Sequence, residues 1–152
     1  MPLWHYTTGD CLKRIIRDGE IRPATGLVPD GERPIVWFSR REDWEPTATK
    51  TLRGLDGTTR QATMDEMEQL GGGLARIGVL PDTAPYEWLR LKRLSGMSGG
   101  QARRLEKAAL ENRRRSCPAD WRGSFDPVPQ SKWVAVEVLA HGKWVPARIW
   151  RS

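Results

Sequence analysis

The sequence is poor in cysteine and histidine and contains no long apolar run. Cys11 and Cys117 are its only cysteines, and His5 and His141 are its only histidines. This scarcity excludes a disulfide scaffold and gives no zinc-ligand spacing, so we expect no metal site. No stretch reaches the roughly 20 apolar residues of a membrane span, and no signal peptide is visible. We therefore expect a cytoplasmic protein without membrane contact.

The common short motifs of nucleotide-binding and hydrolytic enzymes are also absent. The sequence has no Walker lysine motif and no Gly-x-Gly-x-x-Gly, and Gly71–Gly73 stands outside either pattern. Ser39 is not part of a Gly-x-Ser-x-Gly, so a hydrolase nucleophile elbow is unsupported. Function must therefore be sought in individual side chains and in the distribution of charge.

The composition is typical of one globular domain. The chain has 152 residues, of which 38% are hydrophobic and 29% charged, and we expect a soluble, monomeric domain over residues 1–152. Eight tryptophans are many for this length. Most should be buried, because tryptophan removes a large apolar area from water, with one or two available to line a pocket.

Hydrophobic periodicity predicts an α+β fold with a mixed or antiparallel sheet. Short apolar strands are expected at Leu3–Thr7 and Ile35–Ser39, and Thr8 or Asp10 should cap a helix that ends at Gly19. The C-terminal residues predict a hairpin of strands 132–139 and 143–150, with Pro146 marking an edge strand. Further predicted elements are helices over 61–70, 86–94 and 101–115, a strand over 74–80 and a loop over 116–131.

Positive charge is concentrated in one segment. The net charge of the chain is +6, and Arg90 to Arg115 contains nine basic and two acidic residues. The rest of the chain is therefore close to neutral. Such a segment is either a solvated helix face or a surface for an anionic partner.

Two polar residues in apolar strands are candidates for function. Glu137 shares a strand face with Trp133, Ala135 and Leu139. A carboxylate there must have a partner or face a cleft, because burying an unpaired charge is costly. It is either paired with a core arginine such as Arg148 or functional.

His5 and Ser39 leave a similar choice. His5 lies in the first strand, where a lone histidine is more often a hydrogen-bonded core residue than a catalyst. Ser39 ends the second apolar strand, and its hydroxyl can cap the following backbone or donate to a ligand.

Three segments together resemble the ADP-ribosyltransferase superfamily. Leu3–Thr7, a helix and the turn Asp18–Pro23 resemble its opening, where a histidine ends the first strand. Ile35–Ser39 resembles its second strand, with an aromatic-plus-serine ending, and Val134–Val138 resembles the late strand that carries the catalytic glutamate. The resemblance covers about half the chain and is nearest to small bacterial DNA-modifying toxins and RNA 2′-phosphotransferases.

The resemblance implies a split mixed sheet around a cleft, with a basic helical insertion. It also implies NAD as the substrate, no metal, and mono-ADP-ribosyl transfer to a nucleic acid or a protein, in a toxin or in phage defence. Glu137 would be the catalytic residue and His5 would bind the ribose next to adenine. The expected NAD-binding residues are His5, Tyr6, Thr7, Arg22, Trp37 and Ser39, and those for nucleic acid are Arg103, Arg104, Lys107, Arg113, Arg114 and Arg115.

One feature of the superfamily has no counterpart in the sequence. The tyrosine that many members stack on nicotinamide cannot be placed, and Trp37, Phe38, Trp44 and Tyr86 are candidates for its role. Two other functions remain open: an RNA 2′-phosphotransferase, and a non-catalytic module that binds nucleic acid or an acidic protein. If His5 and Glu137 share a cleft, an enzyme is favoured; if each has its own partner on opposite sides of the sheet, a binding module is favoured.

Overall fold

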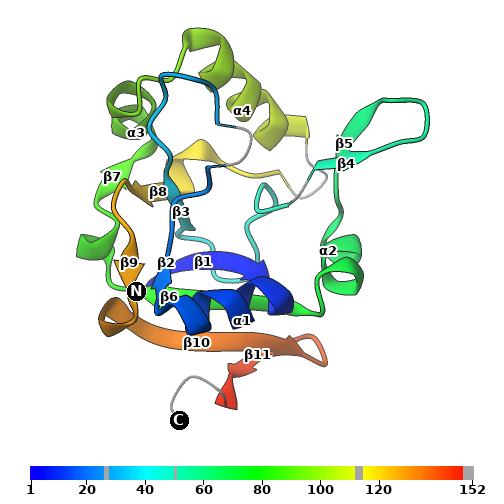
Figure 1. Ribbon diagram of the computed structural model, residues 1–152, viewed down its shortest axis with the longest axis vertical. Coiled ribbons are helices and arrows are strands. Elements are labelled where there is room, and N and C mark those ends of the chain that lie inside the picture. The colour runs from blue at the N-terminus through cyan, green and yellow to red at the C-terminus, as the bar shows by residue number, and fades with distance from the viewer. Residues whose placement is uncertain (26–27, 50, 112–114, 149–152) are drawn as a thin grey trace.

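The computed structural model describes residues 1–25, 28–49, 51–111 and 115–148, and a seven-stranded sheet runs through it (Figure 1). The α-helices and strands, in chain order, are β1 (Leu3–Thr8), α1 (Gly9–Asp18), β2 (Glu20–Ile21), β3 (Val36–Ser39), β4 (Thr51–Arg53), β5 (Thr59–Gln61), α2 (Met64–Leu70), β6 (Leu74–Val79), β7 (Tyr86–Glu87), α3 (Trp88–Leu94), α4 (Gly99–Glu111), β8 (Trp121–Ser124), β9 (Val128–Pro129), β10 (Trp133–Ala140) and β11 (Lys143–Pro146). Short 3₁₀ helices lie at Pro81–Thr83, Pro118–Asp120 and Gln130–Lys132.

The large sheet is antiparallel at every pairing of neighbouring strands. Its order is β11-β10-β6-β1-β3-β8-β7, and the pairs β2–β9 and β4–β5 form two smaller sheets. β6 lies between β1 and β10 and runs opposite to both, so these two strands share a direction without being neighbours. The predicted α+β class is confirmed, and of the two sheet types that periodicity left open the antiparallel one is observed. The mixed sheet implied by the resemblance is wrong, because each pair of neighbouring strands is antiparallel.

The sheet divides between β1 and β3. β1 pairs with β6 along all six of its residues, whereas one position, Trp4 opposite Ser39, joins β1 to β3. Past that position the side chain of His5 spans the gap, with Nδ1 lying 2.8 Å from the carbonyl oxygen of Trp37. The three strands predicted around a cleft lie in one sheet. β1 and β10 lie on one side of this division, and β3 lies on the other.

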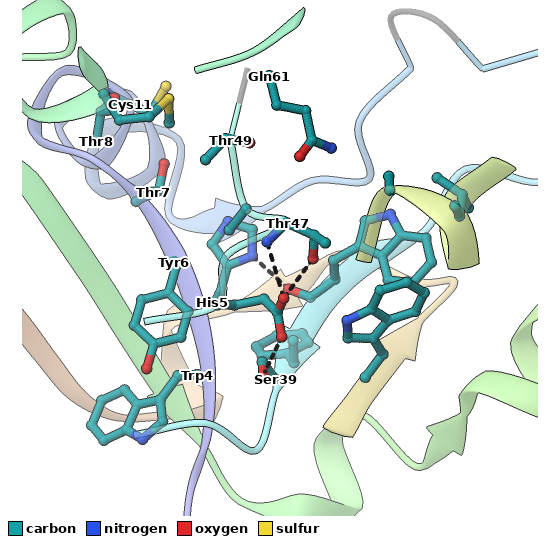
Figure 2. Close-up of a pocket in the computed structure, with 18 residues that line it drawn as sticks. Trp4, His5, Tyr6, Thr7, Thr8, Cys11, Ser39, Thr47, Thr49 and Gln61 are labelled. Carbon is teal, nitrogen blue, oxygen red and sulfur yellow. Dashed lines mark hydrogen bonds between the residues drawn. The ribbon is translucent and has the colours of Figure 1, made fainter. Parts of the chain in front are cut away.

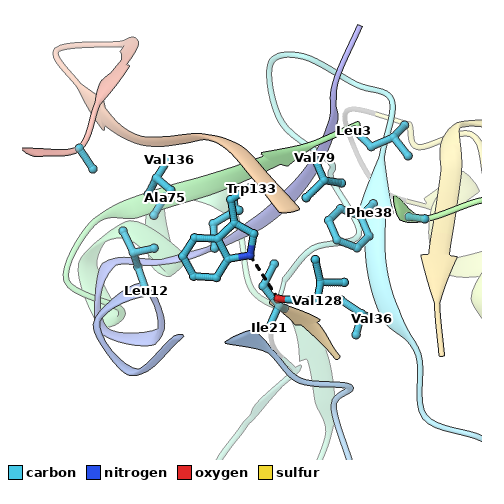
Figure 3. Close-up of a cluster of buried hydrophobic side chains, with 13 residues drawn as sticks. Leu3, Leu12, Ile21, Val36, Phe38, Ala75, Val79, Val128, Trp133 and Val136 are labelled. Carbon is cyan, nitrogen blue, oxygen red and sulfur yellow. Dashed lines mark hydrogen bonds between the residues drawn. The ribbon is translucent and has the colours of Figure 1, made fainter. Parts of the chain in front are cut away.

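Helices cover both faces of the sheet. On one face, Leu12 of α1 packs in a cluster with Trp133 of β10, whose Nε1 donates to the carbonyl oxygen of Val128 at 3.2 Å (Figure 3). On the other face, Met67 of α2 joins a second cluster. A third cluster connects Trp121 of β8 to α3 and α4. Alternation of side chains along β1 supplies both of the first two clusters.

The predicted ends of the first helix are confirmed. Thr8 is the N-cap of α1, and its Oγ1 accepts a hydrogen bond from the backbone N–H of Cys11 at 3.3 Å. Gly19 is the C-cap with a φ of 74°, a left-handed conformation that costs glycine little. The C-terminal hairpin is also confirmed, with Pro146 on the edge strand β11. The strand predicted over 143–150 ends at Pro146, and residues 149–150 lie outside the described residues.

The glycine run Gly71–Gly73 packs against the start of α1. The backbone N–H of Gly9 donates to the carbonyl oxygen of Gly73 at 2.9 Å. A Cβ atom at Gly9 would lie 2.3 Å from the carbonyl oxygen of Gly72. The run therefore permits a close backbone approach that orients α1, and it needs no phosphate ligand to explain it.

Several regions differ from the sequence-based expectation, among them the helix predicted over 86–94, which begins at Trp88 because Tyr86–Glu87 forms β7. The stretch predicted as a loop contains β8, which pairs with both β3 and β7. Its sequence Trp-Arg-Gly-Ser has no alternating pattern, and Gly123 is required because a Cβ there would lie 2.8 Å from Ile35 and Leu91. The helix predicted from residue 61 begins at Met64, because the β4–β5 hairpin occupies the preceding residues.

Candidate active site

A cleft of about 380 Å³ opens where β1 and β3 separate (Figure 2). Its lining comes from β1, β3, the loop after β3, the first turn of α1, and side chains of α2, α4 and β8. Five of the six side chains predicted to bind NAD lie there, namely His5, Tyr6, Thr7, Trp37 and Ser39. Segments far apart in the sequence thus meet at one site because the sheet divides.

Arg22 lies outside this cleft. Its side chain is 63% exposed, and its Nε lies 3.0 Å from a carboxylate oxygen of Glu20. It borders a separate hollow with Arg33, whose guanidinium lies 4.0 Å from the ring centroid of Phe125. The prediction that Arg22 binds NAD together with the other five residues is not supported by this position.

His5 is a neutral, oriented imidazole. Because the carbonyl oxygen of Trp37 can only accept, the Nδ1 atom of His5 carries the hydrogen of their 2.8 Å bond. Burial lowers the pKa of His5 below its ordinary value of 6.5, and this effect outweighs the bond to Trp37. The Nε2 atom is therefore left as a hydrogen-bond acceptor.

Tyr6 helps to position the loop that follows β3. Its hydroxyl donates to the backbone carbonyl oxygen of Arg41, and its ring lies 5.1 Å from that of Trp44 in an edge contact. Burial raises the pKa of the Tyr6 phenol well above its ordinary value, so the group stays neutral. These contacts hold the loop segment that carries Glu45.

Glu45 is a buried carboxylate on the cleft wall, with 5% of its surface exposed. Its Oε1 accepts from the hydroxyl of Ser39 at 2.9 Å. Its Oε2 accepts from the backbone N–H and the hydroxyl of Thr47, at 3.1 and 2.6 Å, and from the hydroxyl of Ser116. Four donors thus compensate for the loss of water around a buried charge.

The charge of the cleft is unusual for a nucleotide site. Apart from the neutral His5, Glu45 is the one residue of the types Asp, Glu, Lys, Arg and His among the described lining residues. Trp37 and Trp121 also line the cleft, with ring centroids 6.0 Å apart. A cleft lined by both a carboxylate and aromatic rings is suited to a flat cation, which both an anion and a π face attract.

Glu137 lies outside the cleft and is paired. Its Oε2 lies 2.6 Å from Nη2 of Arg76 on β6 and accepts from Arg76 Nε at 2.7 Å. The Arg76 guanidinium stacks 3.7 Å from the ring centroid of Trp4 and 4.6 Å from that of Trp144. The expected core arginine is therefore Arg76, the residue opposite Glu137 in the register, and not Arg148.

His5 and Glu137 lie on opposite faces of the sheet. His5 is opposite Ile77 on β6, whereas Glu137 is opposite Arg76, the adjacent residue of the same strand. Successive residues of a strand point to opposite faces. Each residue has its own partner, which is the arrangement expected for side chains that do not act together.

The basic segment borders the cleft through α4. Leu105 and Ala108 line the cleft, whereas Arg103, Arg104 and Lys107 are exposed. The helix predicted over 101–115 runs to Glu111 in the structure, and Arg113 and Arg114 lie outside the described residues. Arg115 is exposed, and its carbonyl oxygen accepts from Nη1 of Arg41 at 3.1 Å.

Sequence reasoning missed Glu45 and Trp121. Both lie in stretches without periodicity, and Glu45 contacts Ser116, 71 residues away in the chain. One local signal was available, since Glu45 stands between a tryptophan and a proline shortly after the Ser39 strand. A charged residue next to a large apolar side chain, close to a candidate ligand-binding strand, is therefore as good a candidate for a functional residue as a charged residue within a strand.

Two structural absences concern the described residues alone. Across residues 1–25, 28–49, 51–111 and 115–148, no three His, Cys, Asp or Glu side chains are grouped as metal ligands would be. Within the same ranges, no helix has both the length and the apolar character needed to cross a bilayer.

Comparisons with protein-family models, with curated proteins and with solved structures found no match to this chain.

Proposed function

We propose that the chain is an NAD-dependent mono-ADP-ribosyltransferase and that NAD binds in the cleft between β1 and β3. The observation that carries this proposal is the buried Glu45 carboxylate in a cleft that is also lined by Trp37 and Trp121. The nicotinamide ring of NAD is a flat pyridinium cation, which is the kind of ligand that such a wall attracts. The resemblance of the strands around His5 and Ser39 to the superfamily supports the same conclusion.

The reaction suits the polarity of the cleft. The bond between C1′ of the ribose and the nicotinamide nitrogen breaks, and its electron pair leaves with neutral nicotinamide. The acceptor atom supplies an electron pair to C1′ and loses a proton to solvent or to a base. Positive charge moves from the ring to the ribose during this step, and a fixed carboxylate nearby stabilises that charge.

Neutral polar groups on β1 are suited to the ribose hydroxyls. His5 offers Nε2 as an acceptor, and Thr7 also lines the cleft. A hydroxyl that donates to an imidazole acceptor is an ordinary hydrogen bond and requires no charge. His5 therefore keeps, in this proposal, the role in ribose binding that the resemblance gives it.

The acceptor is proposed to be a nucleic acid that contacts α4. Arg103, Arg104 and Lys107 are exposed on the same helix whose Leu105 and Ala108 line the cleft. Lysine and arginine contacts to phosphates are sequence-independent and can hold a strand next to a reacting group. A protein acceptor remains an alternative outcome of the test.

A non-catalytic binding module is the second candidate. It is favoured by the placement of His5 and Glu137 on opposite faces, each with its own partner. An RNA 2′-phosphotransferase has less support, because that family uses arginines around a phosphate. Arg22 lies outside the cleft, and Arg40 is exposed and does not line it.

Incubation with NAD labelled in the adenylate half, alone and with DNA, RNA and protein acceptors, tests the proposal. We expect label on one acceptor class and stoichiometric release of nicotinamide. NAD that stays intact in the presence of all three acceptors, while the chain still binds nucleic acid, would favour the binding module. His5→Ala should weaken NAD binding in the transferase and should leave nucleic-acid binding unchanged in either case.

A further inference from the structure

The proposed function leaves open which carboxylate acts on the ligand, and two acidic residues compete for this role. Glu137 occupies the strand position that the resemblance assigns to the catalytic glutamate. Glu45 lies in the loop after β3 and lines the cleft, whereas Glu137 does not. A group that stabilises charge on the ribose must lie within reach of it, so position in the cleft is the first criterion.

The second criterion is whether the negative charge is already neutralised. Glu137 is bound to Arg76 through two nitrogen atoms, at 2.6 and 2.7 Å. In the described part of the chain, Glu45 forms no ion pair. Its four donors come from hydroxyl and amide groups, which orient the carboxylate without cancelling its charge.

The third criterion is a free acceptor site on the carboxylate. A carboxylate offers about two hydrogen-bonding sites on each oxygen. Three of the four bonds to Glu45 end on Oε2, and a single bond, from the Ser39 hydroxyl, ends on Oε1. Oε1 therefore retains capacity to accept from a ligand hydroxyl.

We propose that Glu45 is the catalytic carboxylate of the cleft and that Glu137 is a structural residue. This inference rests on the proposed function. Oε1 of Glu45 would accept from a ribose hydroxyl of NAD and would stabilise the positive charge that develops as the bond from C1′ to nicotinamide breaks. Ser39, Thr47 and Ser116 are then positioning residues that hold the carboxylate.

Matched substitutions separate the two carboxylates. Glu45→Gln and Glu137→Gln each replace a charge by an isosteric amide, and Glu42→Gln removes an exposed charge from the same loop as Glu45. Nicotinamide release, NAD affinity and melting temperature are measured for each. We expect Glu45→Gln to lower turnover at saturating NAD by roughly 10²- to 10³-fold, in addition to any loss of NAD affinity, because the positive charge on the ribose develops only in the transition state.

The controls have distinct expected results. Glu42→Gln should match the parent protein in all three measurements. Glu137→Gln should lower the melting temperature while keeping turnover per folded molecule. A folded Glu45→Gln variant with parental turnover overturns the inference, and so does a folded Glu137→Gln variant that is inert.

A second pair of variants keeps the test valid if Glu45→Gln does not fold. Thr47→Val removes one hydroxyl donor and keeps the backbone bond from residue 47, and Ser116→Ala removes another donor. Both leave the carboxylate in place. Lower turnover with unchanged NAD affinity in both supports the inference, whereas parental turnover in both overturns it.

Failure of the proposed function has its own signature. If the parent protein does not consume NAD with any acceptor, binding of two probes is compared. One probe is 1-methylnicotinamide, a pyridinium cation methylated at the ring nitrogen, and the other is neutral nicotinamide. A preference for the cation that Glu45→Gln removes and Glu42→Gln keeps shows that Glu45 faces the ligand in a non-catalytic site, so the transferase fails. An equal affinity for both probes overturns the role of Glu45 as well.

Discussion

Arg76 and Glu137 face each other on neighbouring strands, and two nitrogen atoms of the Arg76 guanidinium contact one carboxylate oxygen of Glu137. The guanidinium also lies over the rings of Trp4 and Trp144. Arg76 is 8% exposed, and its Nη1 also donates to the backbone carbonyl oxygen of Glu42. The pair therefore connects β6, β10 and the loop after β3. The pair thus helps to fix the loop after β3, which lines the cleft.

Glu137→Gln should destabilise the protein, because it leaves Arg76 buried without its counter-charge. We expect a cost of roughly 2–4 kcal/mol, which is less than for a fully buried pair because this pair is partly exposed. Glu20→Gln is the control, since it breaks an exposed pair with Arg22 and should change the stability little. Denaturant unfolding measures both values. Equal free energies of unfolding for the two variants would contradict a structural role for Glu137.

The stability of the fold should fall as the pH decreases below about 6.5. Burial lowers the pKa of His5 in the folded protein, so the unfolded chain takes up a proton at a higher pH than the folded chain does. Protonation then favours the unfolded state throughout the interval from 6.5 down to the folded-state value. Stability contributed by neutral His5 is thus present above pH 6.5 and is lost on acidification.

His5→Asn should reduce the slope of the free energy of unfolding against pH in this interval. His141→Asn serves as the control, because His141 is exposed in the β10–β11 turn and should leave the slope unchanged. Urea unfolding at a series of pH values gives the slopes. An unaltered slope in His5→Asn would show that other groups cause the acid sensitivity.

Replacement of basic residues on α4 should weaken nucleic-acid binding and its salt dependence. Arg103→Gln with Arg104→Gln is expected to lower the log–log salt slope by about one unit for each phosphate that the protein no longer neutralises. Lys13→Gln with Arg17→Gln removes the same charge from exposed positions of α1 and is the control. Similar reductions in affinity for both double variants would indicate an effect of net charge alone.

Two glycines near helix starts should respond oppositely to alanine. Gly9→Ala places a Cβ atom 2.3 Å from a backbone carbonyl oxygen, and we expect a destabilisation of roughly 1–3 kcal/mol. At Gly100, the nearest atom to a new Cβ is the Ser98 hydroxyl at 3.9 Å, so alanine should stabilise α4 by about 0.5–1 kcal/mol. Thermal unfolding of the two variants tests the sign of each effect.

The elements that sequence reasoning predicted are those with local signals. Thr8, Gly19 and the hairpin around His141 each depend on a few adjacent residues, and all are confirmed. The placement of β6 between β1 and β10 depends on pairing between distant segments, for which no local pattern exists. Periodicity therefore left open whether the sheet is mixed or antiparallel, and the mixed sheet implied by the resemblance was wrong.

The candidate site was predicted in part for the same reason. His5 and Ser39 lie on short apolar strands and were recognised, and both line the cleft. Glu45 was missed because its environment is built by Ser116 and Trp121, which follow it by more than 70 residues. Glu137 was a candidate because it is a carboxylate in an apolar strand. Its ion pair with Arg76 explains how the strand accommodates this charge.

The division between β1 and β3 also has a consequence for cooperativity. In the backbone of the sheet, a single opposed pair of residues joins β1 to β3 at this seam, and the imidazole of His5 adds one hydrogen bond across it. Amide protons of β6 and β10 should exchange with solvent through rarer openings than those of β3 and β8, since regions with fewer cross-strand bonds open as separate units. A ligand that contacts both sides of the seam would couple the openings of the two units. Amide exchange in β3 and β8 would then slow when the ligand binds, whatever the chemical identity of that ligand.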